Sequence, residues 1–174
     1  MSSYLIGLLA GVAFGLLILV AIKVRNRGKF ATVAEKAEYL SKRRARMLPV
    51  LAFIFLSQQG TKLSTSPDSS AQSAKIAAWL MLSIVLIAAL ATKGFWLEPK
   101  EVRDLMDDEN TRANRNDGMR WGFLFSMAAA VGIYFLTIFD NVKARESIHI
   151  IMSVGIAAAL IRWGYLERRA HRDA

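Results

Sequence analysis

The 174-residue chain contains no cysteine, and it has only two histidines and three prolines. A chain without cysteine can form no disulfide, no thiolate metal site and no thiol nucleophile. His149 and His171 lie far apart in the sequence and lack the paired spacing of a metal site. Nucleophile-elbow, zinc-protease and phosphate-loop motifs are also absent. We therefore expect no catalytic residue, no cofactor and no metal, and we predict that the protein is not an enzyme.

Acidic residues are missing from the long apolar runs of the chain. Four runs, at 4–22, 76–96, 120–139 and 147–166, contain no Asp or Glu. About 20 mostly apolar residues form a helix that crosses the roughly 30 Å hydrocarbon core of a bilayer, so each run is a candidate span. A fifth run, at 47–56, has only ten residues. It could cross the membrane, re-enter it or lie at its surface.

The distribution of positive charge favours a crossing by the fifth run. Short cytoplasmic loops carry an excess of Lys and Arg. If 47–63 is a span, 19 of the 23 Lys and Arg residues lie on one side of the membrane and four on the other. If it is not, the best division is 13 against 10. The sequence therefore predicts an all-α, polytopic protein with a single membrane-embedded domain over 1–174 and spans at about 4–22, 47–63, 76–96, 120–139 and 147–166.

The same charge rule orients the chain. The basic stretches 23–46 and 97–118 and the C-terminal tail should be cytoplasmic, while the N-terminus and 64–74 should lie outside. The first apolar run is preceded by no side-chain charge and ends without a small-residue cleavage site, so we expect an uncleaved anchor and not a signal peptide. The composition is typical of a multi-pass protein of a bacterial plasma (inner) membrane.

Two polar stretches are expected to form short cytoplasmic helices. Residues 31–46 have an amphipathic pattern that ends in a basic cluster. The cluster consists of Lys42, Arg43, Arg44 and Arg46. A polybasic segment beside an anionic leaflet gains roughly 1 kcal/mol per charge, so we predict that the cluster contacts anionic lipid and not nucleic acid. Residues 98–117 should form the second helix, which begins at Glu98-Pro99 and ends at a break over 116–118.

Small residues recur at every fourth position in two of the apolar runs. The first row consists of Gly7, Gly11 and Gly15, and the second of Gly122, Ser126 and Ala130. In lipid, helices associate through close backbone contact, which such rows permit. We interpret both rows as helix-packing faces. The first row could serve packing within the chain or could recruit a second copy or another membrane protein.

These observations favour a non-enzymatic structural or interaction component of the membrane, without a nucleic-acid partner. The alternative is a subunit of an oligomeric transporter or channel for small molecules or ions. Pro49 and the polar run 58–60 are the only hints of the discontinuous helix that transporters use. His149, near the outer end of the last span, is expected to be an interfacial histidine and not a proton or metal group.

Overall fold

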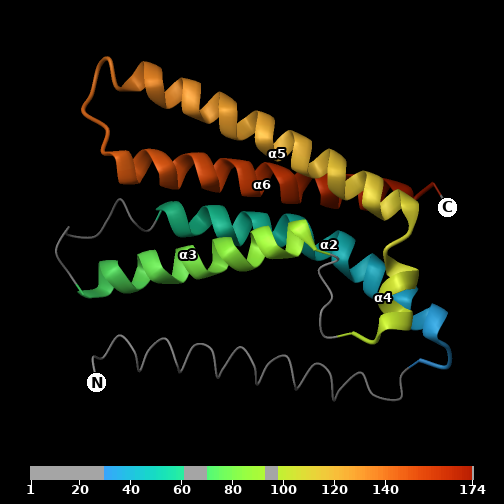
Figure 1. Cartoon of the computed structure of the whole chain (residues 1–174). Coiled ribbons are helices and arrows are strands. Elements are labelled where there is room, and N and C mark those ends of the chain that lie inside the picture. Colours follow the sequence, from blue (N-terminus) through green and yellow to red (C-terminus); the bar gives the residue numbers. More distant parts are fainter. Residues whose placement is uncertain (1–29, 61–69, 93–97, 174) are drawn as a thin grey trace.

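The computed structural model describes residues 30–60, 70–92 and 98–173, and all regular structure within them is helical (Figure 1). The helices are α2 (Val33–Gly60), α3 (Ser70–Ala91), α4 (Lys100–Met106), α5 (Glu109–Leu136) and α6 (Ala144–Ala170). The prediction of an all-helical protein is therefore confirmed for this part of the chain. The predicted first span, 4–22, lies outside the described residues.

Helix α6 is the centre of the bundle. Helix α5 packs along one side of α6, and α2 packs along the other. Helix α3 lies beside α2 and also contacts α6, while the short α4 packs on the N-terminal part of α2. The four long helices alternate in direction (Figure 1). The N-terminal ends of α2 and α5 therefore lie at the same end of the bundle as the C-terminal ends of α3 and α6.

The main hydrophobic core is built by α2, α3 and α6. Its buried side chains are Leu48, Ala52, Phe55, Trp79, Leu86, Leu90, Ile156, Ala157, Ala159, Leu160 and Trp163. Phe55 and Leu160 are almost completely buried, and the Phe55 and Trp79 rings stack at 6.3 Å between centroids. A smaller cluster joins α2 to α4. Helix α5 contributes no side chain to the main core, which makes its contact with α6 different in kind.

Helix α2 corrects the expectation of a separate surface helix over 31–46. The polar stretch and the apolar run from residue 47 form one continuous helix, with Pro49 inside it. Its start is fixed locally, because the Thr32 hydroxyl accepts a hydrogen bond from the Glu35 amide, at 3.1 Å, and the Glu35 carboxylate accepts one from the Ala31 amide. The basic cluster therefore belongs to the same rigid element as the proposed second span.

The second polar stretch also differs from its prediction. A short helix does follow Pro99, but α4 ends at Met106 and α5 begins at Glu109, where the Asp108 carboxylate accepts a hydrogen bond from the Thr111 amide at 2.7 Å. Helix α5 then runs without interruption through 116–118, so the predicted break is wrong. Gly118 is buried against α6, and a Cβ there would lie 2.9 Å from the Ala159 carbonyl oxygen. The glycine permits close approach between helices and does not end one.

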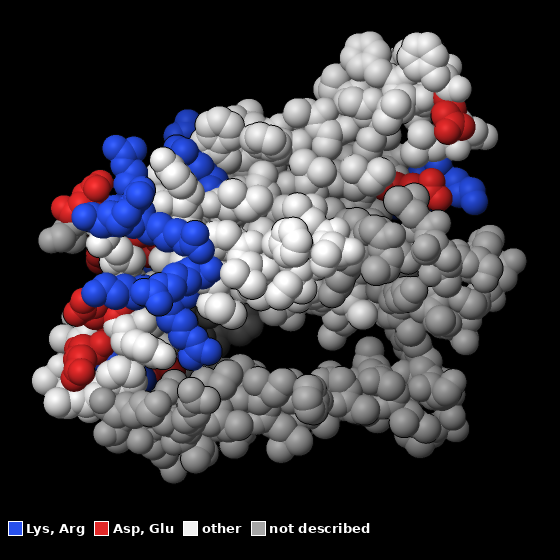
Figure 2. All heavy atoms as spheres, turned by 180° about the vertical axis from the view of Figure 1, so that it is seen from behind, with Lys and Arg blue, Asp and Glu red and all other residues white. Residues whose placement is uncertain are grey.

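Charged residues gather at the two ends of the bundle. One end, here called the basic end, holds the N-terminal half of α2, α4, the start of α5 and the last turns of α6 (Figures 1 and 2). Among the described residues, the segments 47–60, 76–92, 121–139 and 147–161 contain no Asp, Glu, Lys or Arg. They form an uncharged band between the basic end and the opposite end, which holds the 137–143 turn. Helices α5 and α6 are long and apolar enough to cross a membrane, and 77–91 of α3 is a shorter apolar helix.

Candidate functional site: an ionic junction at the basic end

A buried ion pair joins α2 to α6 where the uncharged band meets the basic end. The Arg44 guanidinium donates to the Glu167 carboxylate at 2.8 Å, and the two side chains are only 6% and 3% exposed. Such a pair loses most of its hydration, so it is stable only when its geometry is good and further hydrogen bonds surround it.

Those further bonds come from α5 and α6. The same Arg44 nitrogen donates to the Thr111 hydroxyl at 3.0 Å, and the Trp163 indole donates to the second Glu167 oxygen at 3.2 Å. The guanidinium carbon of Arg44 also lies 5.4 Å from the centroid of the Trp163 ring, within cation–π range. We call these four residues the ionic junction, because they bring three helices together at one point.

Pro49 creates a second polar contact close to the ionic junction. Proline has no amide hydrogen, so the Ala45 carbonyl loses its usual partner four residues later. Arg168 of α6 replaces that partner: its Nε donates to the Ala45 oxygen at 3.0 Å, and its second nitrogen donates to the Arg46 oxygen at 3.1 Å. Gly164 leaves room for the proline ring, since a Cβ there would lie 2.7 Å from Pro49 Cδ. Although Pro49 hinted at a discontinuous helix, α2 continues through it and packs against α6 at this point.

A third polar group ties α4, α5 and the end of α3 together. The buried Asp107 carboxylate accepts hydrogen bonds from Arg112 at 2.9 Å and from Arg115 at 3.3 Å. Arg115 also donates to the carbonyl oxygen of Thr92, just after α3. Farther along α5, Asp117 pairs with Arg162 of α6 at 2.7 Å. The basic residues in this region therefore hold helices together as well as contributing surface charge.

The four residues predicted to contact anionic lipid have different environments. Lys42 pairs with Glu38 across one helical turn, and this hydrogen bond and charge lower the pKa of the Glu38 carboxyl below its usual value. Arg44 is buried in the ionic junction and does not lie on the surface. Arg46 is exposed and Arg43 is half-buried. A lipid surface facing this helix would therefore meet mainly Arg46, Arg43 and the partly neutralised Lys42.

The predicted small-residue row on α5 lies against α6. A Cβ added to Gly122 would lie 2.7 Å from the Gly155 carbonyl oxygen, and one added to Gly155 would collide with the Ser126 hydroxyl. Ser126 donates to the Ile151 carbonyl oxygen at 3.4 Å. Ala130, the third member of the row, is half-buried. The row Gly7, Gly11 and Gly15 lies outside the described residues.

His149 packs at the opposite end of α6. Its ring lies 3.7 Å from that of Trp79 between centroids, and its backbone carbonyl accepts a hydrogen bond from the Ser153 hydroxyl at 2.7 Å. The Trp79 indole donates to Ser153 at 3.2 Å, which joins α3 to α6. In the described part of the chain, no three His, Cys, Asp or Glu side chains come close enough together to hold a metal ion.

Sequence patterns alone do not predict the ionic junction at the basic end. They place Thr111 in the polar helix expected over 98–117 and Glu167 in the C-terminal tail. One signal was present: Trp163 and Glu167 are four residues apart, so an indole donor and a carboxylate acceptor share a helical face.

Comparison of the chain with protein-family models, with curated proteins and with solved structures finds no match.

Proposed function

We propose that the protein is a small multi-pass integral membrane protein that acts as a non-enzymatic structural or interaction component of a plasma (inner) membrane. The observation that carries the proposal is the exposure of α5. Only 11% of its most apolar 18-residue stretch is buried, against 44% for α6. The core helix of a water-soluble protein would be mostly buried, whereas a helix that faces hydrocarbon need not be.

The exposed side chains of α5 are large and apolar along its length. Examples are Phe123, which is 63% exposed, and Phe135, which is 57% exposed. Together with the exposed apolar residues of α2 and α3, they produce a broad uncharged face between the charged ends (Figure 2). A continuous apolar surface of this kind marks a membrane or protein interaction site. Its position between two charged ends fits a bilayer.

The charge distribution supports a cytoplasmic location for the basic end. That end carries many more Lys and Arg residues than the opposite end, whose described cations include Lys143 and Arg145. By the positive-inside rule, the C-terminus is then cytoplasmic and the 137–143 turn faces outward. In this orientation Arg43 and Arg46, with Lys42, face the headgroups of the inner leaflet, where anionic lipid attracts them.

Membrane insertion is tested by washing isolated membranes with alkaline carbonate. We expect the protein to remain in the pellet and to be released only by detergent, because transfer of its apolar surface from lipid to water is unfavourable. Release by carbonate alone would contradict the proposal. Trp79, Trp121 and Trp163 provide an independent readout, since lipids brominated along their chains should quench the fluorescence of an inserted protein.

The interaction role is tested on the first glycine row. Gly11→Leu should weaken association with a second copy or with another membrane protein in mild detergent, because a branched side chain fills the space between helices. Leu9→Ala is the matched control, since it changes the same run without adding bulk. Equal association of both variants and the native protein would show that this row is not part of the interface.

A further inference from the structure

The uncharged band is shorter on three of the four long helices than a typical membrane requires. The charge-free segments 47–60 of α2 and 147–161 of α6, and the apolar part of α3, Ala77–Ala91, have 14 or 15 residues each. At 1.5 Å per residue, such a segment is about 21–23 Å long. The hydrocarbon core of a typical bilayer is roughly 30 Å thick, so the three segments fall short of it by about 7–9 Å.

An ion pair between α5 and α6 fixes the border of the band at the basic end. The Arg162 guanidinium donates to the Asp117 carboxylate at 2.7 Å, and its carbon lies 5.4 Å from the centroid of the Trp121 ring. Both charged side chains are 35% exposed, so the surroundings of the bundle reach them. A long cationic side chain can usually extend from a span to the headgroups. Arg162 is instead held by a short carboxylate of the neighbouring helix, so hydrocarbon must end at the level of this pair.

The opposite border of the band lies at the start of α6. Lys143, Arg145 and Glu146 are all exposed and directly precede the charge-free segment of that helix. Ile148 and Ile161 are outward-facing apolar residues next to the two borders. They are 13 residues apart in one helix, which corresponds to about 20 Å along its axis. The outward-facing surface of α6 therefore gives the same short height as the charge-free segments.

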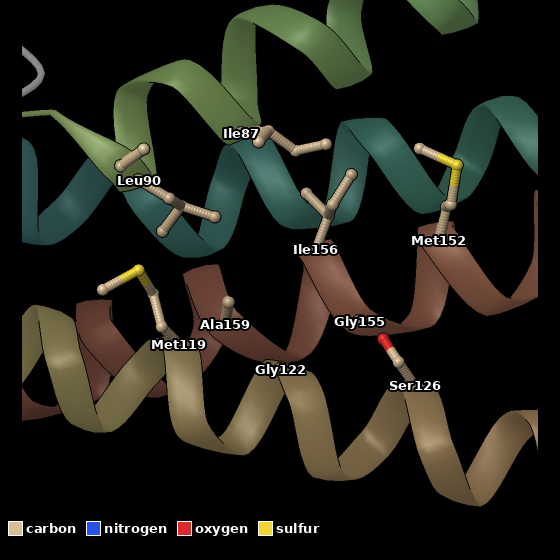
Figure 3. A pocket seen from close by; sticks show the side chains of 10 residues that line it. Ile87, Leu90, Met119, Gly122, Ser126, Met152, Gly155, Ile156 and Ala159 are labelled. Atoms are coloured by element: carbon tan, nitrogen blue, oxygen red, sulfur yellow. The ribbon is translucent and has the colours of Figure 1, made fainter.

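Helix α5 has a longer charge-free segment, 121–139, but this length does not measure the height of the band. Its close contact with α6 includes Gly122, Ser126 and Gly155, at an apolar groove between α3 and α5 (Figure 3). Beyond this contact α5 is inclined to α6 and leaves the bundle (Figure 1). An inclined helix spans a thinner layer than its length. Tyr134, exposed near its end, is a residue type that collects at the membrane–water interface.

We propose that the protein is matched to a thin bilayer, with a hydrocarbon core of about 22 Å, as lipids with short acyl chains provide. The inference rests on the membrane insertion proposed above and adds the thickness of the bilayer that the protein fits. A thicker bilayer must either become thinner around the protein or cover the Asp117–Arg162 pair, and both are unfavourable. Tilting the whole bundle does not help, because it lowers the band further.

The test measures how tightly the reconstituted full chain binds phosphatidylcholines of different chain length. Each vesicle combines brominated dioleoyl phosphatidylcholine with one competitor of the series dimyristoleoyl, dipalmitoleoyl, dioleoyl, dieicosenoyl and dierucoyl phosphatidylcholine. Quenching of tryptophan fluorescence then gives the binding constant of each competitor relative to the dioleoyl lipid. Trp121 reports on the lipid contact, since it is 40% exposed beside the ion pair. We expect one of the two shortest lipids to bind most tightly, and the binding constant to fall several-fold toward the dierucoyl lipid.

A pair of variants tests the border assigned to the ion pair. Asp117→Leu with Arg162→Leu removes both charges, so that the charge-free segment of α6 continues to Leu166. This adds about 7 Å to its length, and the lipid that binds most tightly should shift toward longer chains. Asp117→Glu with Arg162→Lys is the matched control. It keeps both charges at the same positions and should keep the preference for short chains.

Three results would overturn the proposal and leave membrane insertion intact. The first is a native protein that binds all five lipids equally, and the second is one that binds the dioleoyl or a longer lipid most tightly. The third is a leucine variant with the same preference as the native protein, which would show that the ion pair does not limit the hydrocarbon. A lack of quenching by the brominated lipid in every vesicle would overturn both the thickness and the proposed function.

Discussion

Helix α6 packs against α2 on one side and against α5 on the other, and the two contacts are built from different kinds of residue. Against α2, it uses large buried side chains, the Arg44–Glu167 ion pair and a hydrogen bond from Arg168 to a carbonyl that Pro49 leaves free. Against α5, it uses glycine and serine, and the backbones themselves come close. The α2 contact depends mainly on large buried side chains, whereas the α5 contact depends on small residues along most of its length and on the Asp117–Arg162 pair near the basic end. Changes on the two sides should therefore fail in different ways.

The largest effect is expected at the ionic junction. Glu167→Leu leaves the Arg44 guanidinium buried without its carboxylate, so we expect the free energy of unfolding to fall by about 3–5 kcal/mol. Arg44→Met together with Glu167→Leu removes both charges and should recover much of that loss. Unfolding of the detergent-solubilised protein, followed by tryptophan circular dichroism, measures both. A single variant as stable as the native protein would mean that the pair does not hold α2 on α6.

On the α5 side, added volume should be harmful and lost charge should matter less. Gly122→Ala places a Cβ 2.7 Å from a backbone carbonyl that cannot turn aside, and overpacking of this kind costs about 1–3 kcal/mol. Gly132→Ala is the matched control: nothing described lies within 4 Å of its Cβ, so we expect a gain of up to about 1 kcal/mol from helix propensity. Similar losses in both variants would indicate an effect of glycine replacement in general and not of the close contact between α5 and α6.

A smaller effect is expected where Arg168 meets α2. Arg168→Met removes the donor to the Ala45 carbonyl and should destabilise the protein by about 1 kcal/mol. Pro49→Ala restores an amide hydrogen at position 49, which can bond to the same carbonyl. Arg168→Met should therefore cost less in the Pro49→Ala background than in the native one. Equal costs in a double-mutant cycle would show that the two groups are independent.

The smallest effects are expected on the exposed cations of α2. Arg46→Gln should weaken the preference of the reconstituted protein for phosphatidylglycerol over phosphatidylcholine by up to about 1 kcal/mol at low salt. Lys42→Gln should weaken it less, because Glu38 already offsets its charge. Quenching of the tryptophan fluorescence of the reconstituted protein by brominated phosphatidylglycerol in phosphatidylcholine vesicles, at two salt concentrations, compares them. An equal or larger loss for Lys42→Gln would mean that the Glu38 pair does not persist on a lipid surface.

The sequence predicted helices well where their composition is uniform. The apolar runs of α3, α5 and α6 appear as helices near the expected positions, because apolar runs of this length favour a helix over a strand. The predicted helix ends after 31–46 and at 116–118 are wrong. The first prediction rested on the change from polar to apolar residues, and the second on Asn-Asp-Gly. In both places the helix continues and packs against α6.

The ionic junction could not be predicted because it depends on distant pairs. Arg44, Thr111 and Glu167 come from three helices, and each has nearer residues of opposite charge or similar polarity in the sequence. Only the packing of α2 and α5 on α6 selects these partners. The row Gly122 and Ser126 was visible from spacing alone, although its partner Gly155 was fixed only by the crossing of the two helices.

The central claim is that the uncharged band lies in a membrane with the basic end in the cytoplasm. It is tested most directly by placing single cysteines in this cysteine-free chain at two exposed positions, Asn141 in the turn after α5 and Asp173 after α6. A membrane-impermeant maleimide applied to intact cells should label Asn141→Cys, and it should label Asp173→Cys only after the cells are opened. Labelling of Asp173→Cys but not Asn141→Cys in intact cells would contradict the proposed orientation, and labelling of both would contradict the crossing itself.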